Sequence, residues 1–216
     1  MGMMFQDFAE ARKRMVAGQL RPRGINDRRV LEAFESVPRH LFVPEDEREW
    51  SYDDYPLPIG FQQTISQPYI VGYMLQMLAL TGTERVLEVG TGSGYQTALL
   101  SRLAAEVHTI ELIPALAERA SIVLAGTEAT NILLHIGDGS QGWSESAPYD
   151  AIVVSAATPH VPQPLLDQLA GGGRMILPVG GRGFQELELW RREGESFTHE
   201  SLLAVAFVPL RGMDGK

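Results

Sequence analysis

Short apolar runs alternate with helical patterns through most of the chain. The runs are rich in β-branched residues and apolar on both faces, as buried strands are. They are RVLEV (85–89), EVHTI (106–110), NILLHI (131–136), DAIVV (150–154) and RMILPV (174–179). Between most of them lie segments of helical spacing, such as YQTALLSRLAA (95–105) and PALAERASIVLAG (114–126). This alternation predicts an α/β fold with a doubly wound, mostly parallel sheet.

The last part of the chain has a different pattern. QELELWRR (185–192) and FTHESLLAVAFV (197–208) are joined by the short EGES turn (193–196). Two strands joined so closely predict an antiparallel hairpin that completes the sheet.

The N-terminal part predicts a small helical region, because residues recur there at helical spacing. The first helix ends near Gly18 and contains Phe5, Phe8, Arg12, Met15 and Val16. The second begins at Asp27 as N-cap and stops at Pro38, and one of its faces carries Val30, Leu31, Phe34 and Val37. A loop over residues 43–58 precedes a third helix, from Pro68 to Leu80, with Gly82 as terminator. We expect residues 1–58 to pack on the α/β part at 59–216, giving effectively one domain.

Composition excludes several kinds of protein. The chain has 216 residues and a formal net charge of −9, which argues against nucleic-acid binding, and no basic stripe suggests an anionic membrane. Cysteine is absent, so disulfides, thiolate nucleophiles and Cys-ligated metals are excluded. No signal peptide or long apolar run is evident, and the default expectation is a cytoplasmic protein.

A glycine loop, Gly90-Thr91-Gly92-Ser93-Gly94, links the first strand of this pattern to a helix. In doubly wound sheets ligands bind beyond the carboxyl ends of the strands, and glycines let the backbone approach them. Glu111 ends the next strand, where it can accept hydrogen bonds from ribose, and Asp138 follows the third, where an adenine amino group could donate. Either acid alone would more often be a helix N-cap or a solvated loop carboxylate, but acids at successive strand ends favour a nucleoside site.

Two nucleoside ligands fit such a site. Dinucleotides usually require G-x-G-x-x-G, whereas this chain has G-x-G-x-G with Glu88 two residues before it. A carboxylate there is unfavourable beside a pyrophosphate, but attracts the ammonium and sulfonium charges of S-adenosylmethionine. The spacing and Glu88 therefore favour a methyl donor over NAD.

The amide-rich segment, IGFQQTISQP (59–68), holds many neutral hydrogen-bonding groups and no charge. Such groups can hydrogen-bond a ligand without forming a tight ion pair. The alternative is structural, because Ser66 or Gln67 before Pro68 would also begin a helix well.

The chain resembles the protein-L-isoaspartate (D-aspartate) O-methyltransferase family. The resemblance rests on PLPIGFQQTISQP, VLEVGTGSGYQTALL, IELIP, GDG, PYDAIVVSAA and LAGGGRMILPVG, in this order, and runs from about Val37 to about Leu210. It implies the sheet of class I S-adenosylmethionine-dependent methyltransferases, with an N-terminal helical extension and the C-terminal hairpin. It also implies a repair enzyme that methylates the α-carboxylate of L-isoaspartyl residues in damaged proteins.

The resemblance assigns site residues by position. Ser66 is the catalytic residue, and Gln63, Thr64 and Ile65 bind the substrate. The cofactor-binding positions are Thr64, Ser66, Glu88, Gly90, Gly92, Ser93, Gly94, Glu111, Asp138 and Gly139. No metal is implied. Gln62 stands where relatives often have a small residue.

Carboxyl methylation needs no general base, because the nucleophile is already ionised at neutral pH. The five histidines (His40, His108, His135, His160 and His199) show neither ligand nor dyad spacing, which agrees with this chemistry. The alternatives are a methyltransferase with another acceptor, an NAD-dependent dehydrogenase, and a non-catalytic relative that binds damaged proteins. We expect damaged proteins and peptides as partners, and a monomer.

Overall fold

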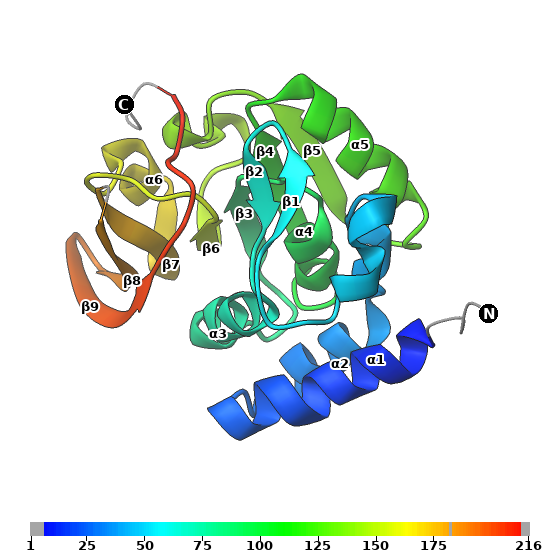
Figure 1. The fold of residues 1–216 in the computed structure, drawn as a ribbon. Helices are drawn as coiled ribbons and strands as arrows, with labels where there is room; N and C mark the ends of the chain where they lie inside the picture. The colour runs from blue at the N-terminus through cyan, green and yellow to red at the C-terminus, as the bar shows by residue number, and fades with distance from the viewer. Residues whose placement is uncertain (1–6, 182, 213–216) are drawn as a thin grey trace, which may run out of the picture.

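The protein, described here from a computed structural model, contains one seven-stranded sheet and one two-stranded hairpin (Figure 1). The structure describes residues 7–181 and 183–212. The large sheet has the order β5-β4-β3-β6-β7-β8-β9. Its strands are β3 (Arg85–Val89), β4 (Glu106–Glu111), β5 (Ile132–Ile136), β6 (Tyr149–Val154), β7 (Leu169–Gly181), β8 (Phe184–Glu193) and β9 (Ser196–Val205). All seven strands that the sequence predicts are present.

Parallel pairing joins β5 to β7 through β4, β3 and β6, whereas β8 and β9 run antiparallel to their neighbours. The order reverses between β3 and β6, since the chain first adds β4 and β5 on one side of β3 and then β6 on the other. Such a switch point opens a crevice at the carboxyl ends of the strands. The predicted fold class, including the C-terminal hairpin, is confirmed.

The two faces of the sheet belong to different core clusters, as alternation along a strand requires. Val86 packs in the larger cluster with the N-terminal helices, while Leu87 packs in the smaller one with α6 (Gln163–Asp167). The helices α4 (Tyr95–Leu100) and α5 (Pro114–Ala125) contribute to the larger cluster. Within the described residues, none of the helices combines the length and apolarity needed to cross a bilayer.

The N-terminal helices lie beside α3 (Pro68–Leu78), at the bottom of the view in Figure 1. They are α1 (Phe8–Met15), continued by a π-helical turn (Val16–Leu20) and a 3-10 turn (Arg21–Arg23), and α2 (Arg28–Ser36), followed by two 3-10 helices (Arg39–Phe42 and Glu45–Trp50). Met15, Phe34 and Leu75 share one cluster with Leu99 of the α/β part. The proposed boundary at residues 58 and 59 falls inside β1 (Leu57–Gly60).

Helix starts are predicted better than helix ends. Asp27 caps α2 as predicted, its carboxylate accepting from the backbone N–H of Arg29 and Val30. The prediction that Gly18 ends the first helix is wrong: the helical turns continue through it, and Gly24 (φ 90°) provides the left-handed cap. The prediction of Gly82 as terminator is also wrong, because Ala79 (φ 46°) ends α3. Phe5 lies outside the described residues.

The amide-rich segment forms a β-hairpin. Strands β1 and β2 (Gln63–Ile65) pair antiparallel and are joined through Phe61 and Gln62, which have φ values of 53° and 60°. A left-handed backbone costs a residue with a side chain about 1–2 kcal/mol. The hairpin is anchored to α5 by Arg119, which donates to the Ile59 carbonyl (3.0 Å).

We expect Gln62→Gly to stabilise the protein by about 1 kcal/mol, because glycine adopts this φ without steric cost. Urea denaturation measures the change. Gln63→Gly is the matched control: Gln63 lies in strand β2, where glycine loosens the chain and should destabilise it. A loss of stability in both variants would show that the turn is not strained.

Candidate active site

A cavity of about 90 Å³ opens at the carboxyl ends of β3, β4 and β6; we call it the glycine-loop cavity. It is lined by Gln63, Thr64, Ile65, Ser66, Val71, Val89, Gly90, Thr91, Gly92, Ser93, Tyr95, Gln96, Ile110, Glu111, Leu112, Ile113, Gly139, Ser155, Ala156, Val208, Pro209, Leu210 and Arg211. The structure therefore brings together nine of the residues assigned from the sequence: Gln63, Thr64, Ile65, Ser66, Gly90, Gly92, Ser93, Glu111 and Gly139. This is the position that the switch point predicts for a ligand.

The glycine loop is tied to the end of β4. The N–H groups of Gly90 and Thr91 both donate to the Ile110 carbonyl (2.9 and 3.2 Å), and Gly90 has φ 94°. Gly94 (φ 85°) caps α4 but does not line the cavity. A Cβ at Gly94 would lie 3.2 Å from Leu124, so this glycine allows α5 to approach the loop.

Glu111 holds the same loop through its side chain. One carboxylate oxygen accepts from the Gly92 N–H (2.8 Å) and the other from the Ile113 N–H (2.9 Å). Each oxygen keeps a further lone pair for a ligand hydroxyl. Glu111 lines the cavity, so its carboxylate can organise the loop and accept from a ribose at the same time.

Glu88 lies beneath the loop and does not line the cavity. It is fully buried, and its carboxylate accepts from the hydroxyls of Thr97 (2.5 Å) and Thr109 (2.7 Å) and from the Gln96 amide (3.1 Å). Burial raises the pKa of Glu88 to about 7, against the opposing effect of these hydrogen bonds. Glu88 therefore does not reach the cavity, and this geometry offers no direct contact between its carboxylate and a cationic ligand.

Gln96 stands between Glu88 and the cavity. Its amide nitrogen donates to Glu88 (3.1 Å) and to the Ser155 hydroxyl (2.8 Å), which uses both of its protons. Only the amide oxygen remains for a ligand, and an oxygen acceptor favours a donating or cationic group. Neither Gln96 nor Ser155 was assigned from the sequence. Ser155 directly follows β6, so the rule that identifies Glu111 could also have found it.

Asp138 does not line the glycine-loop cavity either. It lines a neighbouring cavity of about 300 Å³ with Trp143 and accepts from the N–H (3.0 Å) and hydroxyl (2.7 Å) of Ser140. Gly139 does reach the glycine-loop cavity. A Cβ at Gly139 would overlap Val89, so glycine is required for this approach.

Ser66 lies where two cavities meet. A second space of about 410 Å³, which we call the outer cavity, is lined by Pro56, Thr64, Ser66, Gln67, Ile70, Ser155 and residues 204–208. Four residues line both spaces: Thr64, Ser66, Ser155 and Val208. The residue that caps α3 is Gln67, without a side-chain capping bond, and the Ser66 hydroxyl has no hydrogen-bond partner among residues 7–181 and 183–212. The capping alternative for Ser66 is therefore not supported.

The segment after β9 closes both cavities and was not foreseen as part of the site. It crosses back over the sheet, where Ala157 donates to the Val208 carbonyl and Leu210 donates to the Ala157 carbonyl (both 2.8 Å) (Figure 1). This pairing places residues 208–211 against the glycine-loop cavity. Arg211, a cation in its wall, carries no sequence signal that would have marked it.

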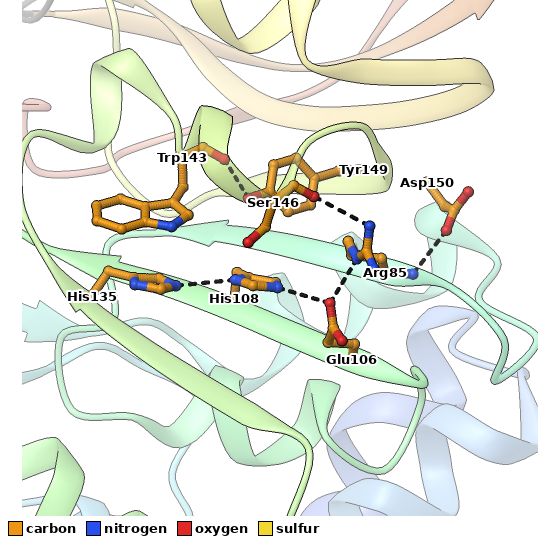
Figure 2. Close-up of polar contacts among 8 residues, drawn as sticks. All are labelled: Arg85, Glu106, His108, His135, Trp143, Ser146, Tyr149 and Asp150. Carbon is orange, nitrogen blue, oxygen red and sulfur yellow. Dashed lines mark hydrogen bonds and ion pairs between the residues drawn. The ribbon is translucent and has the colours of Figure 1, made fainter.

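Two histidines meet outside these cavities (Figure 2). His108 contacts His135 (3.0 Å) and Glu106 (2.8 Å), and Trp143 stacks on His135 with ring centroids 4.1 Å apart. Because the carboxylate accepts from one ring nitrogen of His108, the other accepts from His135 when both rings are neutral. The expectation that the histidines form no dyad was based on spacing, and spacing cannot show a contact between neighbouring strands. The cluster fastens the loop after β5 to the sheet.

Comparison with known families gives a match over residues 11–215 to the model for protein-L-isoaspartate(D-aspartate) O-methyltransferase. A protein-L-isoaspartate O-methyltransferase of Roseiflexus sp. (strain RS-1) is 56% identical over 206 residues, covering 95% of this chain and 94% of the relative. A relative of the same name from Syntrophobacter fumaroxidans is 54% identical over 209 residues, covering 97% and 98%.

Solved structures show the same fold. One protein-L-isoaspartate O-methyltransferase superposes with a TM-score of 0.86 at 26% identity, covering 94% of this chain and 67% of the other. A Plasmodium falciparum protein, described as a putative protein-L-isoaspartate O-methyltransferase in complex with S-adenosyl-L-homocysteine, gives a TM-score of 0.80 at 23% identity, covering 94% and 98%.

Proposed function

The chain belongs to the protein-L-isoaspartate(D-aspartate) O-methyltransferase family, and from this premise we propose that its two adjoining cavities hold the methyl donor and the acceptor. The protein is a repair methyltransferase that uses S-adenosylmethionine to methylate the α-carboxylate of L-isoaspartyl residues in damaged proteins. One observation carries the assignment of roles: Ser66 lies in the wall that both cavities share.

The glycine-loop cavity fits the donor by its chemistry. Glu111 offers acceptors for ribose hydroxyls, and Gln96 offers an amide oxygen for the ammonium group. The backbone of Gly90, Gly92 and Gly139 allows close approach. Glu88 acts from behind Gln96, fixing its amide, and Asp138 supports the adenine side through the turn that it caps. When bound, S-adenosylmethionine supplies an electrophilic methyl group on a cationic sulfur.

The outer cavity fits a polypeptide acceptor. Every side chain in its wall is uncharged, so the acceptor's carboxylate meets the hydroxyls of Thr64, Ser66 and Ser155 and is not neutralised by a contacting cation. Thr64 and Ser66 stand between this carboxylate and the donor. Their hydroxyls can orient an oxygen for in-line attack, which makes alignment the main contribution of the chain. Because the carboxylate is already ionised, no general base is needed.

Several finer points are part of the proposal. Action as a monomer is one of them. The net charge of −9 supports the absence of nucleic-acid partners. A cytoplasmic location is the last of these points.

We expect strong selectivity for an isoaspartyl peptide over the same peptide with a normal aspartyl residue. The two differ in where the carboxylate leaves the backbone, and a site that grips backbone and carboxylate together distinguishes the two positions. Transfer of a radiolabelled methyl group to the paired peptides measures the ratio.

Rates are compared at equal peptide concentration and saturating S-adenosylmethionine, with an asparagine-containing peptide as the unreactive control. Equal methylation of the isoaspartyl and aspartyl peptides would contradict the repair function and favour a methyltransferase with another acceptor.

A further inference from the structure

Arg39 connects the N-terminal region to the amide-rich segment. It opens the 3-10 helix Arg39–Phe42 and is fully buried. Its guanidinium donates from Nε to the Ser51 carbonyl and from Nη2 to the Ser66 carbonyl, both at 2.8 Å. The remaining nitrogen, Nη1, is buried without a hydrogen-bond partner. The guanidinium also lies over the ring of Tyr95, 4.9 Å from its centroid, and Tyr95 lines the glycine-loop cavity.

The charge on Arg39 has no contacting carboxylate. Burial lowers the pKa of Arg39 to about 10, so the group stays protonated at neutral pH. None of the ion pairs within residues 7–181 and 183–212 includes it. A buried cation without a partner is costly for folding. Its hydrogen bond to the Ser66 carbonyl places this cation next to the residue that both cavities share.

The backbone beyond Ser66 is fixed by a second group. Asp54 accepts from the Gln67 amide (2.8 Å) and from the Tyr69 N–H (3.1 Å), and it pairs with Arg23. The Ser66 side chain itself has no anchor among the described residues. The position of its hydroxyl therefore depends on how its backbone is held, and Arg39 holds the carbonyl of that residue.

We propose that Arg39 is a positioning residue, which fixes Ser66 for methyl transfer and gives the acceptor's carboxylate a positive potential without touching it. This inference rests on the proposed function and adds to it a residue outside both cavity walls. A cation behind the loop attracts the anionic acceptor, while the contacting groups stay neutral and leave the nucleophile reactive.

Arg39→Lys and Arg39→Met separate the two effects. Lysine keeps the charge but cannot hold both carbonyls, so we expect kcat to fall about 10- to 100-fold with KM for the isoaspartyl peptide within about threefold. Methionine removes the charge as well, and KM should also rise about tenfold. Affinity for S-adenosylhomocysteine, measured by calorimetry, should stay within about threefold in both variants, and the calorimetric stoichiometry counts the folded sites.

Arg29→Lys is the matched control. Arg29 also lies in the N-terminal region and donates to two backbone carbonyls, those of Leu80 (2.9 Å) and Leu103 (3.0 Å), but neither cavity contains it. Its kcat per folded site should equal that of the wild type.

Three results would overturn the inference. They are wild-type kcat in Arg39→Lys, an unchanged KM in Arg39→Met, and loss of S-adenosylhomocysteine binding in proportion to activity in both variants, which would mark Arg39 as purely structural. The wild-type enzyme separates this inference from the proposed function. If it fails to prefer the isoaspartyl peptide, the proposed function is wrong, whatever the variants do.

Discussion

Replacing Ser66 with alanine should lower kcat by roughly ten- to thousandfold, the loss expected when one preorganised hydrogen bond to the reacting group is removed. The hydroxyl lies in the wall between the two cavities and has no other partner among the described residues. Its removal leaves the donor contacts of Glu111 and Gln96 intact, so affinity for S-adenosylhomocysteine should stay within about threefold.

Single-turnover rates and thermal melts on the same Ser66→Ala sample make the measurement. Stability should change by less than about 0.5 kcal/mol, because Ser66 does not cap α3. Ser101→Ala is the control: its hydroxyl, unlike that of Ser66, bonds to a helix, donating to the Ala98 carbonyl (2.8 Å) away from both cavities. A destabilised but fully active Ser66→Ala would show that the hydroxyl is part of the architecture only.

Glu88→Gln should change how stability depends on pH. The folded protein raises the pKa of Glu88 from 4.5 to about 7, so it holds this proton more tightly than the unfolded chain. Wild-type stability from this group is complete below pH 4.5 and is lost as the pH rises to about 7. The glutamine side chain does not titrate. The unfolding free energy of Glu88→Gln minus that of the wild type should therefore rise by about 3 kcal/mol between about pH 4.5 and 8.

Urea denaturation across this pH range gives the difference between the two proteins, in which contributions from the histidines cancel. Glu84→Gln is a control of opposite sign. Burial disfavours the Glu84 carboxylate, but hydrogen bonds from Thr81 and Gly82 lower its pKa to about 2. The stabilisation from Glu84 is fully present above pH 4.5. The difference in unfolding free energy between Glu84→Gln and wild type should therefore not change with pH above 4.5. A flat curve for Glu88→Gln as well would mean that its carboxylate is ionised in the fold without cost.

The sequence predicted the fold and the site correctly wherever a local pattern is compatible with only one structure. Strands apolar on both faces need cover on both sides, and the glycine loop between a strand and a helix falls at the switch point. Gly90, Gly92 and Glu111 therefore reached the predicted cavity.

The direction in which a side chain points and the pairing of distant segments could not be predicted from the sequence. Glu88 precedes the glycine loop, but its position in β3 turns it under α4, where Thr97 and Thr109 enclose it. The return of residues 208–211 depends on pairing with Ala157, about fifty residues earlier, and no periodicity signals it. Gly18 failed as a terminator because tertiary packing carried the helical turns past it.

The wall of Thr64, Ser66 and Ser155 also matters for inhibitor chemistry. These three residues belong to both cavities, so only a thin partition separates the two ligands. A single molecule that joins an adenosyl group to an isoaspartyl mimic by a short linker can occupy both spaces. Its second half binds at the high effective concentration that the linker imposes, so tethering adds affinity without any new contact. The glycine loop contributes to the donor cavity alone, so selectivity would come from the acceptor half.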